Sequence, residues 1–364
     1  MAEVKTKRHS GIELLRIMAA CAVVVLHYGN PKMGGALDVV GGGRFYLISL
    51  LITICCCAVN VFVLISGYFL SQSPKRTLGK PFTLYLQVVI FHFIAFSIGL
   101  ALSEFSFEPT GLIPQFLPTN YFVTIYASLY FISPCINSYL KSISQESYKR
   151  IIIILMILFS IYPSLMDVLR EFSGNELTGT STIGNWGSQY GYTIVNFVLL
   201  YIIGAYIRKY GIPAKIGKGK WIIAVISVCI IFGWRIVVSH LHPMGQSSAT
   251  SYLNPFVILL AVCVFGIFRE MKFESKVINE LSKAAFTCFL FHLVVIERIG
   301  IRDYAPGPFL TFALHFVLSV IGIYLISYVI YKLYSLVFNP LIKRLDRYRV
   351  SYEENTPFIS KSEV

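Results

Sequence analysis

The sequence predicts an all-α protein that crosses a membrane about ten times, with both termini in the cytoplasm. Three observations predict this class: a strongly apolar composition, apolar runs of membrane-spanning length, and basic residues that alternate between the connecting segments. Hydrophobic residues make up 56% of the 364 positions and charged residues only 13%, and the mean hydropathy is +0.69. A water-soluble fold has too little interior to bury this much apolar surface, so lipid must solvate much of the chain.

Ten apolar runs approach the length of about 20 residues that crosses the hydrocarbon core. The first follows a basic segment, as in a signal peptide, but no small-residue cleavage site ends it, so we interpret it as an uncleaved span. The fourth is the weakest, because Ser133, Pro134 and Asn137 interrupt it and allow a broken helix or a re-entrant turn. The predicted spans are residues 12–28, 45–70, 79–103, 119–140, 150–168, 190–207, 219–239, 252–270, 283–300 and 309–338.

The distribution of Lys and Arg sets the predicted orientation. With the N-terminus inside, each predicted cytoplasmic segment has at least three basic residues, as the positive-inside rule requires. The net charge of +13 is therefore explained as a topology signal, and no zinc-finger spacing or RNA-binding motif indicates a nucleic-acid partner. The predicted external segments together contain five basic residues, namely Lys32, Arg44, Arg170, Arg298 and Arg302.

Residues 1–340 are predicted to form one transmembrane domain, and residues 341–364 a basic and then polar cytoplasmic tail that is disordered. The longest predicted external segment, about 168–189, is rich in Gly, Ser, Thr and Asn. It is interpreted either as a binding loop or as a plain solvated connection. The eight cysteines lie in apolar stretches with neither a disulfide framework nor a metal-binding spacing, so no metal site is expected.

Ionisable side chains inside predicted spans are the most informative residues, because each is costly to place in hydrocarbon. Arg16 and His27 are eleven residues apart on the first span, which puts them on one helix face, about 16 Å apart along the axis. Glu13 precedes Arg16 by one turn and is able to pair with it. Either Arg16 and His27 reach the two membrane surfaces, or both line one passage through the bundle. In the second case His27 suits general-base chemistry, since imidazole exchanges protons near neutral pH.

The end of the second span combines a small-residue pair with a basic loop. Gly67, beside Ser66, allows a close approach of two helices, which is its expected role. Lys75, Arg76 and Lys80 fit either a topology signal or a site for anionic phosphates. For other ionisable residues, packing or an interface position explains the pattern at least as well as function does. These are His92, Arg235, His240 and His292.

Several segments, in order along the chain, resemble the acyltransferase-3 family of membrane O-acyltransferases. The resemblance rests on their order together with ten predicted spans, and it covers nearly the whole chain. It implies an enzyme that moves an acyl group, usually acetyl from cytoplasmic acetyl-CoA, to a hydroxyl of a cell-surface glycan or a lipid-linked sugar. The segments are Gly11–Ala19 with the later His27, Asn60–Leu70, Tyr130–Asn137, Tyr201–Arg208 and Phe289–His292.

The same resemblance implies roles for individual residues. His27 and Glu13 are the expected catalytic residues, with His27 as general base on the acceptor hydroxyl; family members commonly have Asp where this chain has Glu13. Acyl-CoA is the expected donor substrate, and no permanently bound cofactor is implied. The expected location is the cytoplasmic membrane of a bacterium. The residues expected to bind the donor are Arg16, Ser66, Tyr68, Lys75 and Arg76.

Two other classes fit a polytopic membrane protein. A transporter or flippase of a lipid-linked sugar would line its path with Arg16, Arg235 and the histidines. Transporters often have inverted repeats with matched broken helices, and the sequence contains no such pair. A membrane glycosyltransferase or polymerase is expected to need an acidic or metal-binding external loop, for which Asp167, Glu171 and Glu176 are poor candidates.

Overall fold

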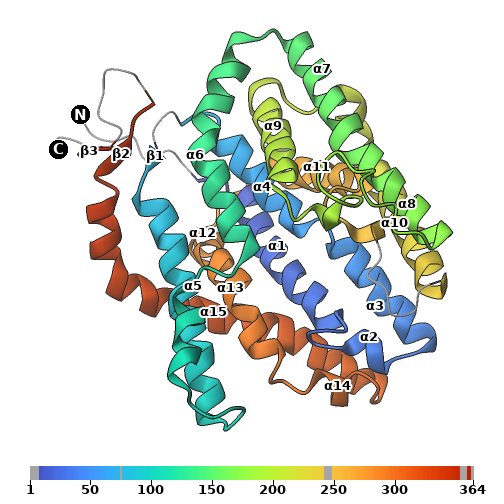
Figure 1. Cartoon of the computed structure of the whole chain (residues 1–364), viewed down its shortest axis with the longest axis vertical. Helices are drawn as coiled ribbons and strands as arrows, with labels where there is room; N and C mark the ends of the chain where they lie inside the picture. Colours follow the sequence, from blue (N-terminus) through green and yellow to red (C-terminus); the bar gives the residue numbers. More distant parts are fainter. Residues whose placement is uncertain (1–7, 74–75, 242–247, 353–358, 362–364) are drawn as a thin grey trace.

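The computed structural model describes residues 8–73, 76–241, 248–352 and 359–361, and most of these are helical. The long helices form one bundle, and Figure 1 shows the first of them running through its middle. The α-helices are α1 (Ser10–Gly29), α2 (Ala36–Val39), α3 (Gly42–Cys55), α4 (Ala58–Leu70), α5 (Gly79–Ala101), α6 (Tyr121–Ser142), α7 (Gln145–Met156), α8 (Tyr162–Ser173), α9 (Ile194–Tyr210), α10 (Ala214–Leu241), α11 (Pro255–Glu270), α12 (Lys276–Leu281), α13 (Ala285–Ile296), α14 (Ile301–Tyr304) and α15 (Phe309–Leu345).

Short elements complete the described chain. Four 3-10 segments are η1 (Pro109–Phe116), η3 (Gln189–Gly191), η4 (Ser248–Thr250) and η5 (Ser282–Ala284), and one π-helical turn, η2 (Ile157–Ile161), joins α7 to α8. A small antiparallel sheet has the order β1-β2-β3, with β1 (Arg76–Thr77), β2 (Tyr348–Val350) and β3 (Ile359–Lys361). The sheet lies beside the start of α5 and the end of α15 (Figure 1).

Each of the ten predicted spans corresponds to helical structure. Among the described residues, eight helical segments are long and apolar enough to cross a membrane. The other two predicted spans are α6, which contains polar residues and a proline, and α9, which has 17 residues. The chain is therefore an all-α, polytopic membrane bundle, while the number of ten spans and the cytoplasmic termini remain predictions.

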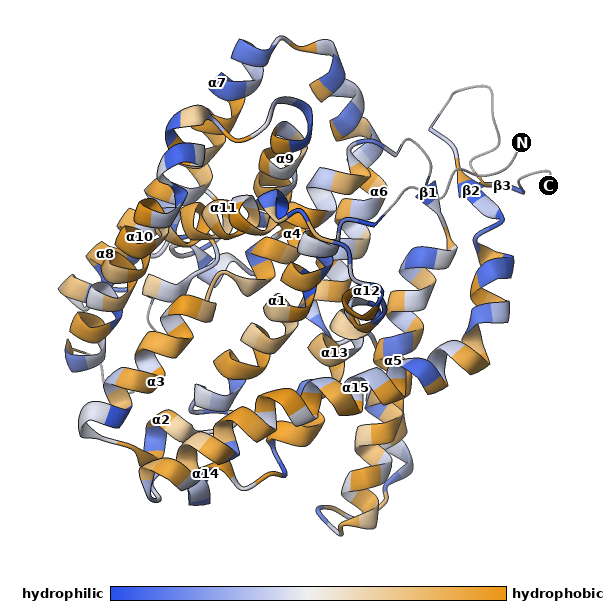
Figure 2. Cartoon of the chain, turned by 180° about the vertical axis from the view of Figure 1, so that it is seen from behind, coloured by the Kyte–Doolittle hydropathy of each residue, from blue (hydrophilic) through white to orange (hydrophobic). Residues whose placement is uncertain are grey.

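The surface of the bundle agrees with a lipid environment. Figure 2 shows apolar residues along the middle of the long helices and hydrophilic residues toward helix ends, such as the start of α7 and the end of α15. The two most peripheral helices expose large apolar side chains, as lipid contact requires. On α10 and α15 they include Trp221, Ile222, Val225, Leu318, Leu333 and Leu336.

Loops of the same predicted side meet in the structure. Arg298 is 2.7 Å from Glu104, and Arg302 is 2.8 Å from Asp38, so three predicted external segments lie together. Arg44 donates to the carbonyl groups of residues 305 and 307 in the third of these segments. Arg44, Arg298 and Arg302 thus each contact protein groups. They are three of the five basic residues in the predicted external segments, where the positive-inside rule expects few.

The predicted tail is partly ordered. α15 continues to Leu345, and β2 pairs with both β1 and β3. Thr77 donates its hydroxyl proton to Asp346 at 2.9 Å, which fastens the end of α15 to the loop after α4. Residues 341–345 thus continue α15, and residues 348–350 and 359–361 form strands, because the backbone of β1 offers the tail a pairing edge that composition does not reveal.

The fourth predicted span contains no break. α6 runs through Pro134, although a proline leaves the carbonyl group four residues earlier without its helical donor. That carbonyl, of Tyr130, instead accepts from the side chain of Arg76 at 3.0 Å and from the hydroxyl of Ser133 at 2.7 Å. Side chains replace the missing donor, so the helix continues at membrane depth.

α4 and α9 cross in close contact at two glycines. A Cβ atom on Gly67 would lie 2.3 Å from the carbonyl oxygen of Tyr201, and one on Gly204 would lie 2.4 Å from that of Leu64. Backbone atoms cannot retreat as a flexible side chain can, so only glycine permits this crossing. The structure thus confirms the packing role expected for Gly67.

Replacing Gly67 with Ala should destabilise the protein by about 1–3 kcal/mol, because the added methyl group overlaps the backbone of α9. Gly233→Ala in α10 is the matched control, since a Cβ atom there meets nothing within 4 Å. Alanine favours a helix over glycine, so the control should be neutral or stabilising. Thermal unfolding in detergent measures both, and an unchanged melting temperature for Gly67→Ala would contradict the tight crossing.

Candidate active site

A cavity of about 390 Å³ opens among α1, α4, α5, α6, α13 and α15. Its volume lies within the range of roughly 300–1,000 Å³ that is usual for ligand sites. Its deep wall is aromatic, with Phe62, Phe122, Phe286 and Phe289. Four cationic residues and one carboxylate also line it, so the cavity suits an anionic molecule with an apolar part. The charged residues are Arg8, Glu13, Arg16, Lys80 and Lys283.

Glu13 and Arg16 form a pair at the cavity wall. A Glu13 oxygen lies 3.5 Å from Arg16 Nη1 and accepts a hydrogen bond of 2.6 Å from the hydroxyl of Ser282. Glu13 is buried, whereas about a third of the Arg16 side chain is exposed. Glu13 therefore orients Arg16 and joins α1 to η5, and the guanidinium remains available to a ligand.

This position does not support the catalytic role expected for Glu13. Glu13 and His27 are fourteen residues apart on the straight helix α1, which corresponds to about 21 Å. Side chains at that separation do not act on the same reacting atoms. The carboxylate is instead a positioning group for Arg16, at the opposite end of α1 from the imidazole.

Some of the residues expected to bind a donor line the cavity, and others do not. Ser66 lines the cavity beside Arg16, and its hydroxyl donates to the Phe62 carbonyl at 2.9 Å. Tyr68 does not line it: the ring is buried, and its hydroxyl accepts from Arg208 at 3.1 Å. Lys75 lies outside the described residues.

Arg76 is fully buried and does not line the cavity. Besides Tyr130, its guanidinium donates to the hydroxyl of Ser133 at 2.7 Å and to the carbonyl groups of Leu70 and Ser73 at 3.3 and 2.7 Å. These bonds join the end of α4 to α6. The expectation that Arg76 binds the donor is therefore replaced by a structural role.

Of the basic loop residues considered for phosphate binding, Lys80 lines the cavity, and Lys283 joins it from η5. Lys80 lies over the rings of Tyr126 and Tyr130, at 5.5 and 5.7 Å from their centroids. Lys283 donates to Glu280 at 2.6 Å and still lines the cavity. Lys80 belongs to the basic loop that the sequence offered for anionic phosphates, whereas Lys283 carried only the topology signal of a basic residue at the start of a predicted span.

His27 and His292 face each other across α1 and α13. His27 Nδ1 lies 3.1 Å from His292 Nε2, and the ring centroids are 4.6 Å apart. Each Nδ1 also contacts a carbonyl group one turn earlier in its own helix, at 2.8 Å for Val23 and 3.1 Å for Cys288. His292 is buried and His27 partly exposed. The imidazole of His27 thus points into the bundle and not into lipid, as a passage along α1 requires.

Phenylalanine rings stand between the cavity and this histidine pair. Phe289 packs 4.9 Å from Phe122, 6.3 Å from Phe62 and 6.3 Å from His292, measured between ring centroids. The rings of Phe62, Phe122 and Phe289 line the cavity, whereas His27 and His292 do not. The histidine pair therefore lies next to the cationic cavity, with the ring of Phe289 in contact with both.

The C-terminal end of α1 is held by a histidine that the sequence does not single out. His315 Nδ1 lies 2.9 Å from the hydroxyl of Tyr28, and its Nε2 lies 2.9 Å from the Ile299 carbonyl. Because a carbonyl only accepts, His315 carries its proton on Nε2 and accepts from Tyr28 through Nδ1. This bond fixes the backbone next to His27.

The other ionisable residues of the spans lie apart from this centre. His92 approaches Thr119 at 3.4 Å, and His240 contacts the carbonyl group of Ile236 at 2.7 Å. Arg235 lies near Cys56. None of the three lines the cavity.

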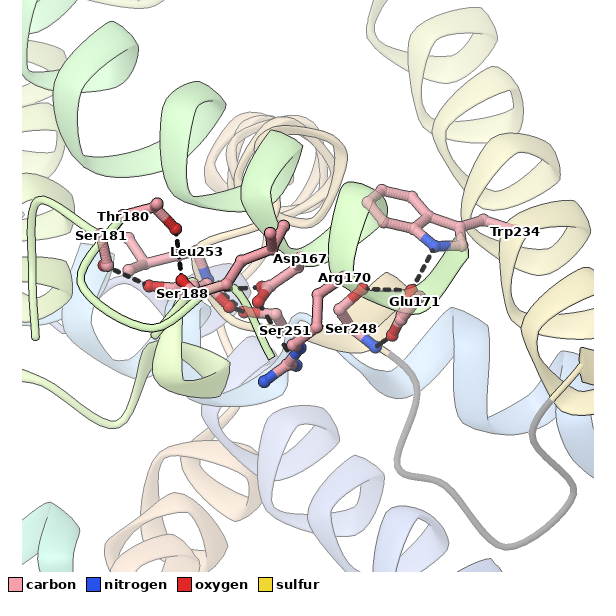
Figure 3. A network of polar contacts seen from close by, with 12 residues as sticks. Asp167, Arg170, Glu171, Thr180, Ser181, Ser188, Trp234, Ser248, Ser251 and Leu253 are labelled. Carbon is pink, nitrogen blue, oxygen red and sulfur yellow. Dashed lines mark hydrogen bonds and ion pairs between the residues drawn. The ribbon is translucent and has the colours of Figure 1, made fainter. Parts of the chain in front are cut away.

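A polar network on α8 fixes the longest predicted external segment (Figure 3). Asp167 accepts from the backbone N–H of Ser188 at 3.1 Å, and Glu171 accepts from the Trp234 indole at 3.1 Å. Ser248 donates its backbone N–H and its hydroxyl proton to Glu171, at 2.7 and 2.8 Å. Both carboxylates are buried and satisfied by protein donors, so this segment is built into the fold.

Comparison with known proteins adds one finding. A family model described as an acyltransferase domain matches residues 9–332. This range extends from the start of α1 into α15 and includes the histidine pair and nearly all of the cavity lining. No curated protein and no solved structure gives a significant match. Because the family model spans most of the chain, this multi-pass membrane protein belongs to the acyltransferase-3 family and is a membrane acyltransferase.

Proposed function

We propose that the protein is an O-acyltransferase that uses cytoplasmic acyl-CoA, foremost acetyl-CoA, and esterifies a hydroxyl of a cell-surface glycan or lipid-linked sugar. The proposed location is the cytoplasmic membrane of a bacterium. The observation that carries the proposal is the cationic cavity whose aromatic wall adjoins the His27–His292 pair. Membership of the acyltransferase-3 family favours this enzyme over a transporter of lipid-linked sugars.

The charged lining of the cavity fits the nucleotide end of acyl-CoA. Its phosphate groups carry several negative charges, and cationic side chains bind phosphate through charge-assisted hydrogen bonds. Arg16, Lys80 and Lys283 converge there from three different helical segments. The slim pantetheine arm then extends along α1 toward the phenylalanine wall. Phe122 and Phe289 have to change rotamer to admit the thioester to His27.

The reaction assigned to His27 is general-base catalysis. The imidazole takes the proton of the acceptor hydroxyl while the hydroxyl oxygen attacks the thioester carbonyl carbon. A C–O bond forms, the C–S bond breaks, and the proton on the imidazolium passes to the thiolate, which leaves as the CoA thiol. General-base assistance of this kind is worth about 100- to 10,000-fold in rate.

The overall activity is tested with inverted membrane vesicles, whose cytoplasmic face is outside. Radiolabelled acetyl-CoA added to the medium should label glycan or lipid-linked sugar inside the vesicles as an alkali-labile ester. Vesicles from cells without the gene are the control. Label that stays in acetyl-CoA, or reaches sugars equally in both preparations, would rule out the proposal.

Lys80→Gln should weaken acyl-CoA binding about tenfold, because one charge-assisted contact with phosphate is lost. The effect should shrink as salt rises, since ions screen exposed charges. Lys215→Gln is the matched control: Lys215 is exposed at the start of α10 and does not line the cavity. Isothermal titration of purified protein with CoA measures both. Equal affinities would show that the cavity is not the nucleotide site.

A further inference from the structure

The hydrogen bonds of the two histidines assign their protons. The carbonyl oxygens of Val23 and Cys288 accept and cannot donate, so the nitrogen that contacts each of them carries hydrogen. Both contacts are made by Nδ1. A neutral imidazole has one N–H group, so His27 and His292 are both in the Nδ1–H tautomer, with an acceptor lone pair on Nε2.

The contact between the rings agrees with this assignment. His292 Nε2, a lone-pair acceptor, lies 3.1 Å from His27 Nδ1, the protonated nitrogen. The N–H of His27 is therefore shared between His292 and the Val23 carbonyl. In the opposite arrangement, with the proton on Nε2 of each ring, both Nδ1 lone pairs would face carbonyl lone pairs. In that arrangement each Nδ1 lone pair would repel the carbonyl oxygen it contacts, so it is unfavourable.

We propose that His292 is a positioning residue that holds His27 as the Nδ1–H tautomer and so leaves Nε2 as the nitrogen that takes the proton. The proposal rests on the function proposed above. It assigns His292 a role in transfer without contact to donor or acceptor. The carbonyl of Val23 favours the same tautomer only while the ring keeps Nδ1 toward it, and the contact with His292 on α13 is what holds the ring in that orientation.

The same contact stabilises His27 after the proton has moved. Once Nε2 is protonated, the ring is a cation, and its Nδ1–H is a charge-assisted donor to His292. His292 is buried and accepts this bond through a lone pair on Nε2, which adds no charge to a low-dielectric site. In serine hydrolases the carboxylate of the catalytic triad orients its histidine in a comparable way.

Two substitutions separate positioning from packing. His292→Gln keeps an acceptor, the amide oxygen, at similar reach from the backbone. His292→Leu fills much of the space and has no acceptor. We expect His292→Leu to lower the turnover number for acetyl transfer about 10- to 100-fold with little change in KM for acetyl-CoA. His292→Gln should remain within about threefold of wild type.

Nitrogen NMR of protein with ¹⁵N-labelled histidine reports the tautomer independently of activity. In wild type, the His27 signals, assigned with His27→Gln, should show hydrogen on Nδ1, and in His292→Leu they should show a mixture of tautomers. A wild-type turnover number in His292→Leu overturns the inference. The inference is also overturned if the Leu and Gln variants lose activity equally while His27 keeps one tautomer. That result would mean that His292 acts only through packing.

The two proposals fail in distinguishable ways. If wild-type vesicles transfer no acetyl group, the proposed function fails, while the NMR comparison still decides whether His292 sets the tautomer of His27. If His292→Leu does not fold, His292→Asn replaces it, because its shorter amide does not reach the Nδ1 of His27. Retained binding of CoA verifies that each variant is folded.

Discussion

Replacing His27 with Gln should lower the rate of acetyl transfer about 100- to 10,000-fold, while CoA binds with its usual affinity. Glutamine has a similar reach but cannot take a proton from the acceptor hydroxyl. The charged lining that we propose as the nucleotide site surrounds Arg16, about 16 Å away along α1, so donor binding should be preserved. Label transfer in vesicles gives the rate, and titration with CoA gives the affinity.

The pH dependence has a defined sign. A general base must be neutral to accept a proton, so the wild-type rate should fall as the pH decreases through the range in which His27 becomes protonated. The residual rate of His27→Gln should lack this decrease. A variant that keeps both the wild-type rate and its pH profile would remove His27 from the mechanism.

His240→Gln is the matched control for this experiment. His240, like His27, lies near the end of a long helix, and its Nδ1 contacts the carbonyl group four residues earlier. It is exposed and has no histidine neighbour among its described contacts. Its replacement should leave the transfer rate unchanged. An equal loss in both variants would indicate a general effect of altered helix ends.

The positions of the helices could be predicted from the sequence, because the length of each apolar run is set by the thickness of the membrane. The continuity of α6 could not. Pro134 removes one backbone hydrogen bond of the helix, and of the two side chains that replace it Ser133 is local but Arg76 lies more than fifty residues earlier. Tertiary contacts of this kind override local propensity.

For the candidate site, too, local features could be predicted from the sequence and tertiary contacts could not. The spacing of Arg16 and His27 along one helix is a local property that left two interpretations open, and the structure agrees with inward-facing side chains: Arg16 lines the cavity and His27 contacts His292. Which basic residues of the next loop reach that cavity depends on how α4, α5 and α6 pack. The pairing of His27 with His292 joins residues 265 positions apart, and neither helix alone indicates it.

Arg76 shows how one sequence pattern fits three physical roles. A basic residue after a span is expected from topology, from phosphate binding, or from hydrogen bonds to helix carbonyl groups that lack a backbone donor. The buried guanidinium and its bonds to Tyr130 and Ser133 select the third role. The consequence is an expectation about stability and not about the affinity for acyl-CoA.

Arg76→Met should lower the unfolding free energy by about 2–4 kcal/mol, because several buried acceptors lose their donor at once. Thermal unfolding in detergent should show the loss, whereas Lys80→Met should leave the melting temperature near that of wild type. A stable Arg76→Met protein with weakened CoA binding would restore the donor-binding role expected from the sequence.

The repair of α6 can be tested directly by giving the helix its own donor. Pro134→Ala supplies a backbone N–H to the Tyr130 carbonyl, so this carbonyl depends less on its side-chain donors Arg76 and Ser133. The double variant Arg76→Met with Pro134→Ala should therefore recover about 1 kcal/mol relative to Arg76→Met, beyond any effect of Pro134→Ala alone. Additive effects would mean that Arg76 stabilises the protein through its contacts with α4, independently of the proline. Coupled effects would show that a cation on one loop is what lets a proline-containing helix remain intact inside the membrane.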